Sequence, residues 1–125
     1  MGVLDWFFFV PSLPRRWDGK NLSDKGTIRT SLRLVSGAQN GIAKHWSIYS
    51  TSISNRHLWA DRSSVSIATV IRSGQREPRG SEQMSLDQDF VILPVVTTSG
   101  AELEWAMRSS QLDAVVARLG SVDIA

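Results

Sequence analysis

The stretch Asp89–Glu104, DFVILPVVTTSGAELE, decides the predicted fold. Residues 89–97 are almost uninterruptedly apolar, which is typical of a buried strand. Ser99 and Glu102 then match the S-x-x-E capping box, in which each side chain accepts a hydrogen bond from the other residue's backbone N–H. We therefore predict that a buried strand runs directly into a helix.

The predicted helix covers residues 99–119. Leu103 and Met107 form one apolar stripe at helical spacing. The Ser109-Ser110 pair predicts a bend, which would divide the segment into two short helices, and Gly120 provides the stop. A second apolar stripe consists of Trp105, Leu112, Val115, Val116 and Leu119.

The chain before residue 89 contains strand patterns separated by turn-forming segments. Asn40-Gly41 is a hairpin signal. Strands are predicted at Val3–Val10, Thr27–Ser36, His45–Ser54 and Ser63–Arg72, with polar connections at Pro11–Gly26, 55–62 and Ser73–Met84. Strands followed by a helix indicate an α+β fold, an antiparallel sheet of five to six strands with a C-terminal helix, in a single domain over residues 1–125.

Composition narrows the possible functions. The chain has no cysteine, which excludes disulfides, thiolate metal sites and cysteine nucleophiles. Residues 1–79 hold twelve Lys/Arg and five Asp/Glu, whereas residues 80–125 hold two and seven. Such an asymmetry suggests one surface facing a polyanion, although chance clustering of charges would give the same counts.

Export and membrane insertion are not expected. The apolar run Trp6–Val10 follows the acidic Asp5 and stops at Pro11, so it is too short for a signal sequence or a membrane span. We therefore expect a soluble protein without a cleaved signal.

No catalytic motif is visible, and we expect no enzyme, cofactor, metal or small-molecule substrate. The chain has only two histidines, His45 and His57, which with Asp61 could supply ligands or a base. Their spacing fits no standard metal site.

The faces of the central strands suggest a binding surface. One face of His45–Ser54 would present Trp46, Ile48, Ser50 and Ser52, and the other His45, Ser47, Tyr49 and Thr51. Hydroxyls, a tyrosine and nearby arginines can bind phosphates and stack on unpaired bases. An ordinary solvated face would carry the same residue types, and both interpretations stay open.

The chain resembles the coat proteins of single-stranded RNA bacteriophages, the leviviruses. The resemblance is carried by DFVILPVVTTSGAELEWAM, residues 89–107, in which an apolar strand with a proline passes through a Thr/Ser tract into an acidic first helical turn. More loosely, HWSIYSTSISNRH and SSVSIATVIR are similar to the two central strands of that family.

The resemblance implies a structural capsid protein of a virion, assembled in the cytoplasm of a bacterial host. Two subunits would interlock as a homodimer through Leu103, Trp105, Met107, Leu112, Val115 and Val116. Dimers would form an icosahedral shell through a loop containing Arg76, Glu77, Pro78 and Arg79.

The same resemblance implies that the sheet faces single-stranded RNA and could also bind an RNA hairpin that represses translation. The RNA-binding candidates are Ser47, Tyr49, Thr51, Ser64, Ser66 and Gln88, with Arg29, Arg33, Lys44 and Arg72 for phosphates. Two alternatives stay open: a small connector protein of a tailed phage, and a stand-alone nucleic-acid-binding module.

Overall fold

The computed structural model describes residues 26–125, so the predicted strand Val3–Val10 and nearly all of the predicted loop after it lie outside the described residues. These residues form one seven-stranded mixed sheet and one short helix, which agrees with the predicted α+β class. The elements are β1 (Thr27–Ser36), β2 (Ser47–Ser54), β3 (His57–Ala60), β4 (Ser63–Val70), the 3-10 turns η2 (Arg72–Gly74) and η3 (Gly80–Met84), β5 (Phe90–Thr97), β6 (Glu102–Arg108), η4 (Ser109–Gln111), α2 (Leu112–Leu119) and β7 (Asp123–Ile124).

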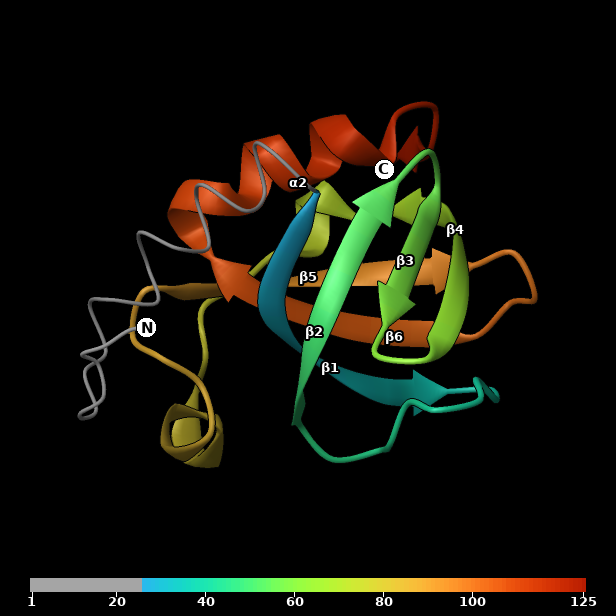
Figure 1. Cartoon of the computed structure of the whole chain (residues 1–125). Coiled ribbons are helices and arrows are strands. Elements are labelled where there is room, and N and C mark those ends of the chain that lie inside the picture. The colour runs from blue at the N-terminus through green and yellow to red at the C-terminus, as the bar shows by residue number, and fades with distance from the viewer. Residues whose placement is uncertain (1–25) are drawn as a thin grey trace, which may run out of the picture.

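The sheet closes on itself as a barrel of six antiparallel strands (Figure 1). Strands β1 to β6 pair in chain order, and β6 returns to pair with β1. Strand β4 pairs with β3 along its first half and with β7, in parallel, along its second half. Closure satisfies the backbone groups that an open sheet would leave at its edges.

The interior of the barrel follows the period-two alternation of the strands. Leu32 on β1 and Leu93 on β5 both lie opposite Trp105 on β6, and all three side chains are fully buried. The indole N–H of Trp105 donates to Thr30 Oγ1 at 2.8 Å, and Thr30 Oγ1 lies 3.1 Å from Thr51 Oγ1. The bond from Trp105 to Thr30 satisfies the indole N–H, which would otherwise be costly to bury.

Helix α2 lies across one end of the barrel, at the top of Figure 1. Its apolar face consists of Leu112, Val115, Val116 and Leu119, and these side chains are buried in the same core as the strands. The helix therefore covers its own barrel.

The prediction of a helix over residues 99–119 is wrong for its first half. Residues 102–108 form strand β6, and the helix begins at Leu112. Thr97–Gly100 make the turn between β5 and β6, in which Gly100 has φ +92° and Ala101 N donates to Thr97 Oγ1 at 3.0 Å. Leu103 and Met107 are four residues apart, but Leu103, Trp105 and Met107 also alternate at period two, and the strand uses that spacing.

Three predicted strands are confirmed within two residues at each end: Thr27–Ser36 is β1, Ser63–Arg72 corresponds to β4 and residues 89–97 correspond to β5. The segment His45–Ser54 begins its strand at Ser47. The predicted polar connection at 55–62 is instead two tight turns around the short strand β3, and this extra strand allows β2 and β4 to join in a closed barrel.

Candidate nucleic-acid interface

Backbone strain is concentrated at the two ends of β3. Asn55, Arg56 and Asp61 have φ of +44°, +68° and +55°, and no other non-glycine residue in the described range 26–125 has a positive φ. The turn between β2 and β3 has the two positive φ values of a type I′ hairpin, in which glycine is favoured at the second position. This chain places Arg56 there, and such strain in a tight turn is common at functional sites.

Both turns are held in place by hydrogen bonds. Asn55 N donates to the carbonyl of Arg118 at 3.0 Å, and Arg56 N to that of Leu119 at 2.7 Å, so the turn caps the C-terminal end of α2. At the other end of β3, Asp61 N donates to the carbonyl of Ser50, and Ser50 N donates to the Asp61 carboxylate at 3.1 Å. The strained residues therefore have fixed positions.

Between these turns, Trp59 stands on the outer face of the barrel with 47% of its surface exposed. Directly opposite it in the pairing register are Ser52 on β2 and Ser64 on β4. Residues directly opposite across strands share a face, so small hydroxyl side chains flank the indole on both sides. The ring is thus accessible, and His57, two residues earlier, lies opposite Ser54 and Ser66 in a parallel row.

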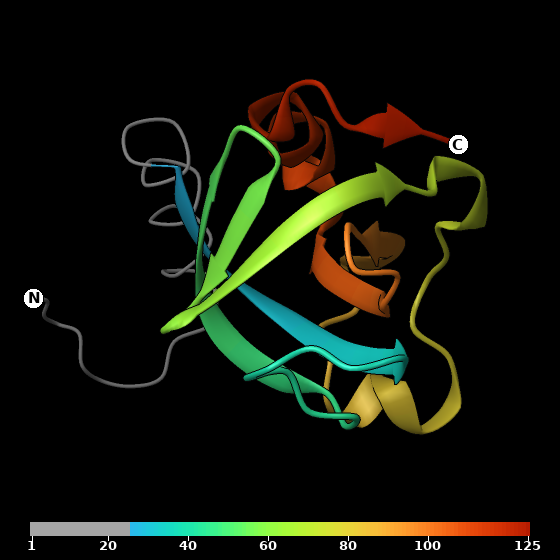
Figure 2. The ribbon, with the colours of Figure 1, turned by 90° about the vertical axis from the view of Figure 1, so that its right-hand side faces the viewer.

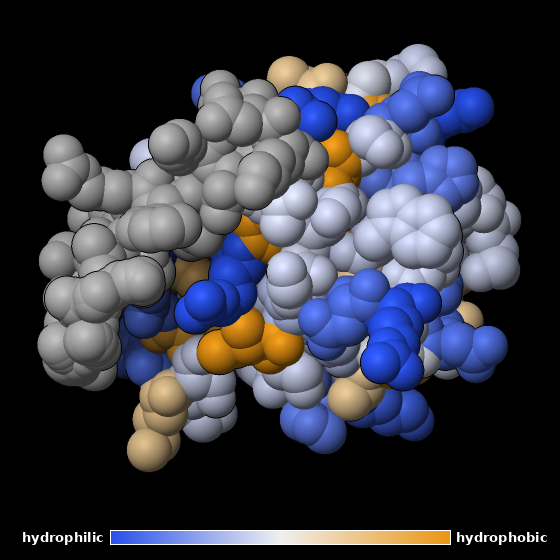
Figure 3. Space-filling model, viewed as in Figure 1, coloured by the Kyte–Doolittle hydropathy of each residue, from blue (hydrophilic) through white to orange (hydrophobic). Residues whose placement is uncertain are grey.

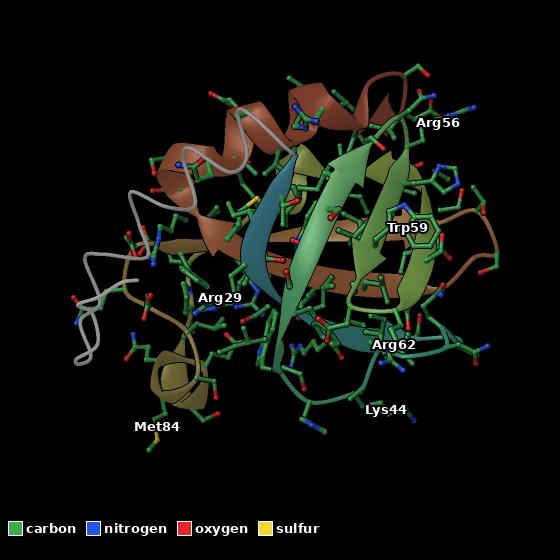
Figure 4. The ribbon with its side chains drawn as sticks, viewed as in Figure 1. Arg29, Lys44, Arg56, Trp59, Arg62 and Met84 are labelled. Atoms are coloured by element: carbon green, nitrogen blue, oxygen red, sulfur yellow. The ribbon has the colours of Figure 1, made fainter. Side chains whose placement is uncertain are left out.

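Four exposed cations surround this face: Arg29, Lys44, Arg56 and Arg62 (Figure 4). Within the part of the chain that the structure describes, none of them forms an ion pair. Asp61 is the only acidic residue between positions 26 and 76. We call Trp59, its row of serines, His57 and these four cations the Trp59 face; it belongs to a mainly hydrophilic side of the molecule (Figure 3).

The predicted RNA-binding residues divide into three groups. Arg29, Lys44, Ser64 and Ser66 lie on or beside the Trp59 face. Arg33 and Arg72 are engaged elsewhere, Arg33 Nε donating to Glu104 at 2.7 Å and Arg72 Nη2 to Asp113 at 3.1 Å. Gln88 is exposed and lines a separate hollow of about 510 Å³ with Arg76 and Phe90.

Tyr49 and Thr51 were predicted on the wrong face. Both are buried inside the barrel, where Thr51 bonds to Thr30 and Tyr49 Oη donates to the Gly41 carbonyl at 3.1 Å. Ser47 lies on the same strand face and is half-buried. The outer face of β2 instead carries Ile48, Ser50 and Ser52, because alternation defines two faces without saying which one is enclosed.

The residues assigned to a dimer interface lie inside the protomer. Leu103, Trp105 and Met107 fill the barrel, and Leu112, Val115 and Val116 attach α2 to it. These six side chains are therefore buried without a second subunit, because the barrel is closed and the helix lies on its own strands.

The loop predicted to join dimers is tied to the barrel by an ion-pair cluster. Arg76 donates to Glu82 at 2.7 and 2.8 Å and to Glu104 at 3.2 Å, and Glu104 also accepts from Arg33. The hydrogen bond from Arg76 lowers the pKa of Glu82 to about 2, and Glu82 in turn raises the pKa of Arg76. In the same loop Pro78 is buried, whereas Glu77 and Arg79 are exposed.

The pKa of Glu82 leads to a test of this cluster. Its folded value lies below the ordinary value of 4.5, so the carboxylate stabilises the fold above about pH 4.5, and this contribution is lost as the pH falls towards 2. We expect Glu82→Gln to lower the melting temperature at pH 7 by about 3–5 °C, as roughly 1 kcal/mol does in a domain of this size. The difference from wild type should shrink steadily below pH 4.5.

The matched control is Glu77→Gln, which removes an exposed carboxylate from the same loop. It should change the melting temperature little at any pH. An equal effect of both substitutions would mean that overall charge, not the cluster, is responsible.

Trp59, Arg56 and Arg62 are absent from the residues predicted for binding. They lie in the segment 55–62 that was interpreted as a connection. Two signals could have identified it: an Asn-Arg pair at a hairpin position, and the alternation of His57 and Trp59 with Leu58 and Ala60, which places the last two on one face of a short strand.

Other types of site find no support among residues 26–125. No group of three His, Asp or Glu residues there could hold a metal ion. None of the helices there has the length and apolar character required to cross a membrane. Comparisons with protein-family models, curated proteins and solved structures found no match to this chain.

Proposed function

We propose that this protein binds single-stranded nucleic acid on the Trp59 face. The observation that carries the proposal is an exposed indole flanked by serines, between two strained turns that each hold an exposed arginine. Aromatic rings stack on unpaired bases of any sequence, and arginine and lysine neutralise the phosphates beside them. The serine hydroxyls would add hydrogen bonds to phosphate or sugar oxygens.

The unpaired state of the nucleic acid follows from the form of this surface. Stacking on Trp59 requires a base with a free face, which a duplex offers only at its ends. No helix formed by residues 26–125 stands on this face, because α2 lies at the end of the barrel with its apolar side buried (Figure 1). A polar strand surface with one exposed indole as a platform suits a splayed single strand.

Packaging of RNA in a coat is a further form of this proposal. The expected interlocked dimer used residues that are buried within the protomer, so a shell would have to be built through other surfaces. The exposed Val35, Ile48 and Met84 are apolar residues available for such contacts. A connector of a tailed phage would use similar contacts without nucleic acid.

One experiment separates these readings. Size-exclusion chromatography with light scattering and paired 260/280 nm absorbance should be run on the full chain expressed in bacteria. Discrete particles that shed nucleic acid at high salt would support a binding module, and megadalton particles that retain RNA after nuclease treatment would support a coat. Fixed small oligomers that bind no oligonucleotide at any salt concentration would contradict the proposal.

Binding itself can be tested at Trp59. We expect Trp59→Ala to weaken binding of a fluorescein-labelled U9 oligonucleotide by about 5- to 150-fold, because stacking on an aromatic side chain contributes about 1–3 kcal/mol per base. Fluorescence anisotropy at 50 mM salt measures the affinity.

Met84→Ala is the matched control, since Met84 is 90% exposed and lies away from the Trp59 face (Figure 4). It should leave the affinity unchanged. If both variants bind U9 like the wild type, the indole is not the stacking platform.

A further inference from the structure

A hollow of about 320 Å³ opens beside the Trp59 face, in the gap between β3 and β7 along β4. Residues 63–66 of β4 pair with β3, and residues 69 and 70 pair with β7. Residues 67 and 68 between them have no strand partner in either β3 or β7. Figure 2 shows β4 crossing the front of the barrel, with β7 along its C-terminal end. Volumes of roughly 300 Å³ are at the small end of the range for pockets that bind ligands.

The hollow has an apolar part and a polar rim. Ala68 supplies the apolar part, since the side chain of Ile67 is fully buried in the core, and the polar groups come from several separate segments of the chain. The polar residues are Arg56, His57, Ser66, Thr98, Ser121 and Asp123. A planar heterocycle fits such a lining, because its faces are apolar and its edge carries hydrogen-bonding groups.

The rim combines two chemically opposite groups. Asp123 is exposed, and in the described part of the chain it forms no ion pair. Its carboxylate can only accept hydrogen bonds, whereas the guanidinium of Arg56 can only donate them. A ligand that satisfies both must present donors on one part of its edge and acceptors on another.

We propose that this hollow binds an unpaired guanine base. Guanine alone among the common bases carries two adjacent N–H donors, N1–H and N2–H, which match the two oxygens of a carboxylate. Its O6 and N7 are acceptors suited to arginine. Adenine and cytosine offer a carboxylate one amino donor next to an acceptor, and uracil places acceptors on both sides of its single N–H.

The hollow adjoins the Trp59 face. The inference that it takes a base from a bound strand therefore rests on the proposed function. His57 and Ser66 belong both to the hollow and to the row beside Trp59. Along β3 the two rows are about 7 Å apart. One strand could therefore stack a base on Trp59 and insert a guanine into the hollow.

The test compares three labelled oligonucleotides, U4GU4, U4AU4 and U9, by fluorescence anisotropy. Wild type should bind U4GU4 about 10-fold more tightly than the other two. Asp123→Asn should remove this preference without weakening U9 binding, because it takes a negative charge away from the phosphates. Glu102→Gln, which removes an exposed carboxylate from β6, should keep the preference.

Competition with GMP and AMP distinguishes the source of the base. Displacement of U4GU4 by GMP but not by AMP would mean that the hollow also accepts free guanine nucleotides. A preference for U4GU4 that GMP does not compete would place the guanine within a strand. Both outcomes support a guanine site.

Failure of this inference differs from failure of the proposed function. Equal binding of all three oligonucleotides, or a preference that survives Asp123→Asn, would overturn the guanine site and leave strand binding intact. If no oligonucleotide binds, the proposed function is overturned. A titration with GMP alone would then test the hollow, and failure of GMP to bind would overturn the guanine site as well.

Discussion

Replacing Trp105 with alanine is expected to lower the free energy of unfolding by about 3–5 kcal/mol, as truncating a large aromatic residue in a core does. Trp105 is fully buried, lies opposite Leu32 and Leu93, and donates its indole N–H to Thr30. The substitution leaves a cavity at the junction of β1, β5 and β6. Denaturant unfolding followed by circular dichroism at several protein concentrations measures the loss.

The matched variant is Trp105→Phe. It keeps an aromatic ring but removes the donor to Thr30, so it should cost much less than alanine. If Trp105→Ala changed the oligomeric state while the protomer kept its stability, Trp105 would be an interface residue, contrary to its place in the barrel.

This expectation changes how assembly variants are interpreted. Under the coat-protein resemblance, loss of particles after Trp105→Asp or Leu112→Asp would indicate an interlocked dimer. In the closed barrel both side chains belong to the core of one protomer. Each substitution would therefore prevent assembly by unfolding the subunit, and only exposed positions can report on contacts between subunits.

The strands could be predicted from local pattern, but the closure of the barrel could not. Alternation in Thr27–Ser36 and the β-branched residues of Phe90–Thr97 determine strand character within each segment. The pairing of β1 with β6 joins residues about seventy positions apart, for example Leu32 with Trp105. Nothing in either segment identifies the other as its partner.

The helix error has a local cause. Ser99, Glu102, Leu103 and Met107 satisfy a capping box and an i, i+4 stripe, and they satisfy a hairpin and a period-two strand equally well. The Ser99-Gly100 pair is the signal that distinguishes the hairpin from the helix, because Gly100 with φ +92° belongs to a turn. Tertiary pairing with β1 and β5 then selects the strand.

The candidate site was predicted in part for similar reasons. Arg29, Lys44, Ser64 and Ser66 follow from charge and from strand alternation. To predict Trp59 and its flanking arginines, one would have had to recognise the four-residue strand β3, which is too short to show a clear period. Their common position on one face depends on the pairing of β3 with both β2 and β4.

Removing the four cations of the Trp59 face should have the largest effect on binding. The quadruple variant Arg29→Ser, Lys44→Ser, Arg56→Gly and Arg62→Ser is expected to bind U9 on the order of 100- to 1,000-fold more weakly at 50 mM salt. The slope of log affinity against log salt should become shallower by up to about 3, since each phosphate contact to a single strand contributes about 0.7. Anisotropy titrations from 50 to 200 mM salt measure both quantities.

The control removes a cation of the same kind elsewhere. Arg79→Ser lies in the exposed loop before η3 and should change neither the affinity nor the salt slope by more than a small fraction of that amount. An equal loss per charge in Arg79→Ser would mean that net charge alone attracts the oligonucleotide. The Trp59 face would then have no special role.

The single substitution Arg56→Gly separates the effect of this residue on stability from its effect on binding. The backbone at φ +68° is unfavourable for any side chain with a Cβ and costs glycine almost nothing, so the variant should be as stable as wild type or more stable, by up to about 1 kcal/mol. Binding of U9 should nevertheless fall about 10-fold, because a phosphate contact is lost. Gain of stability with loss of binding would mean that the strain at Arg56 serves recognition; loss of both would mean that its side chain mainly supports the fold.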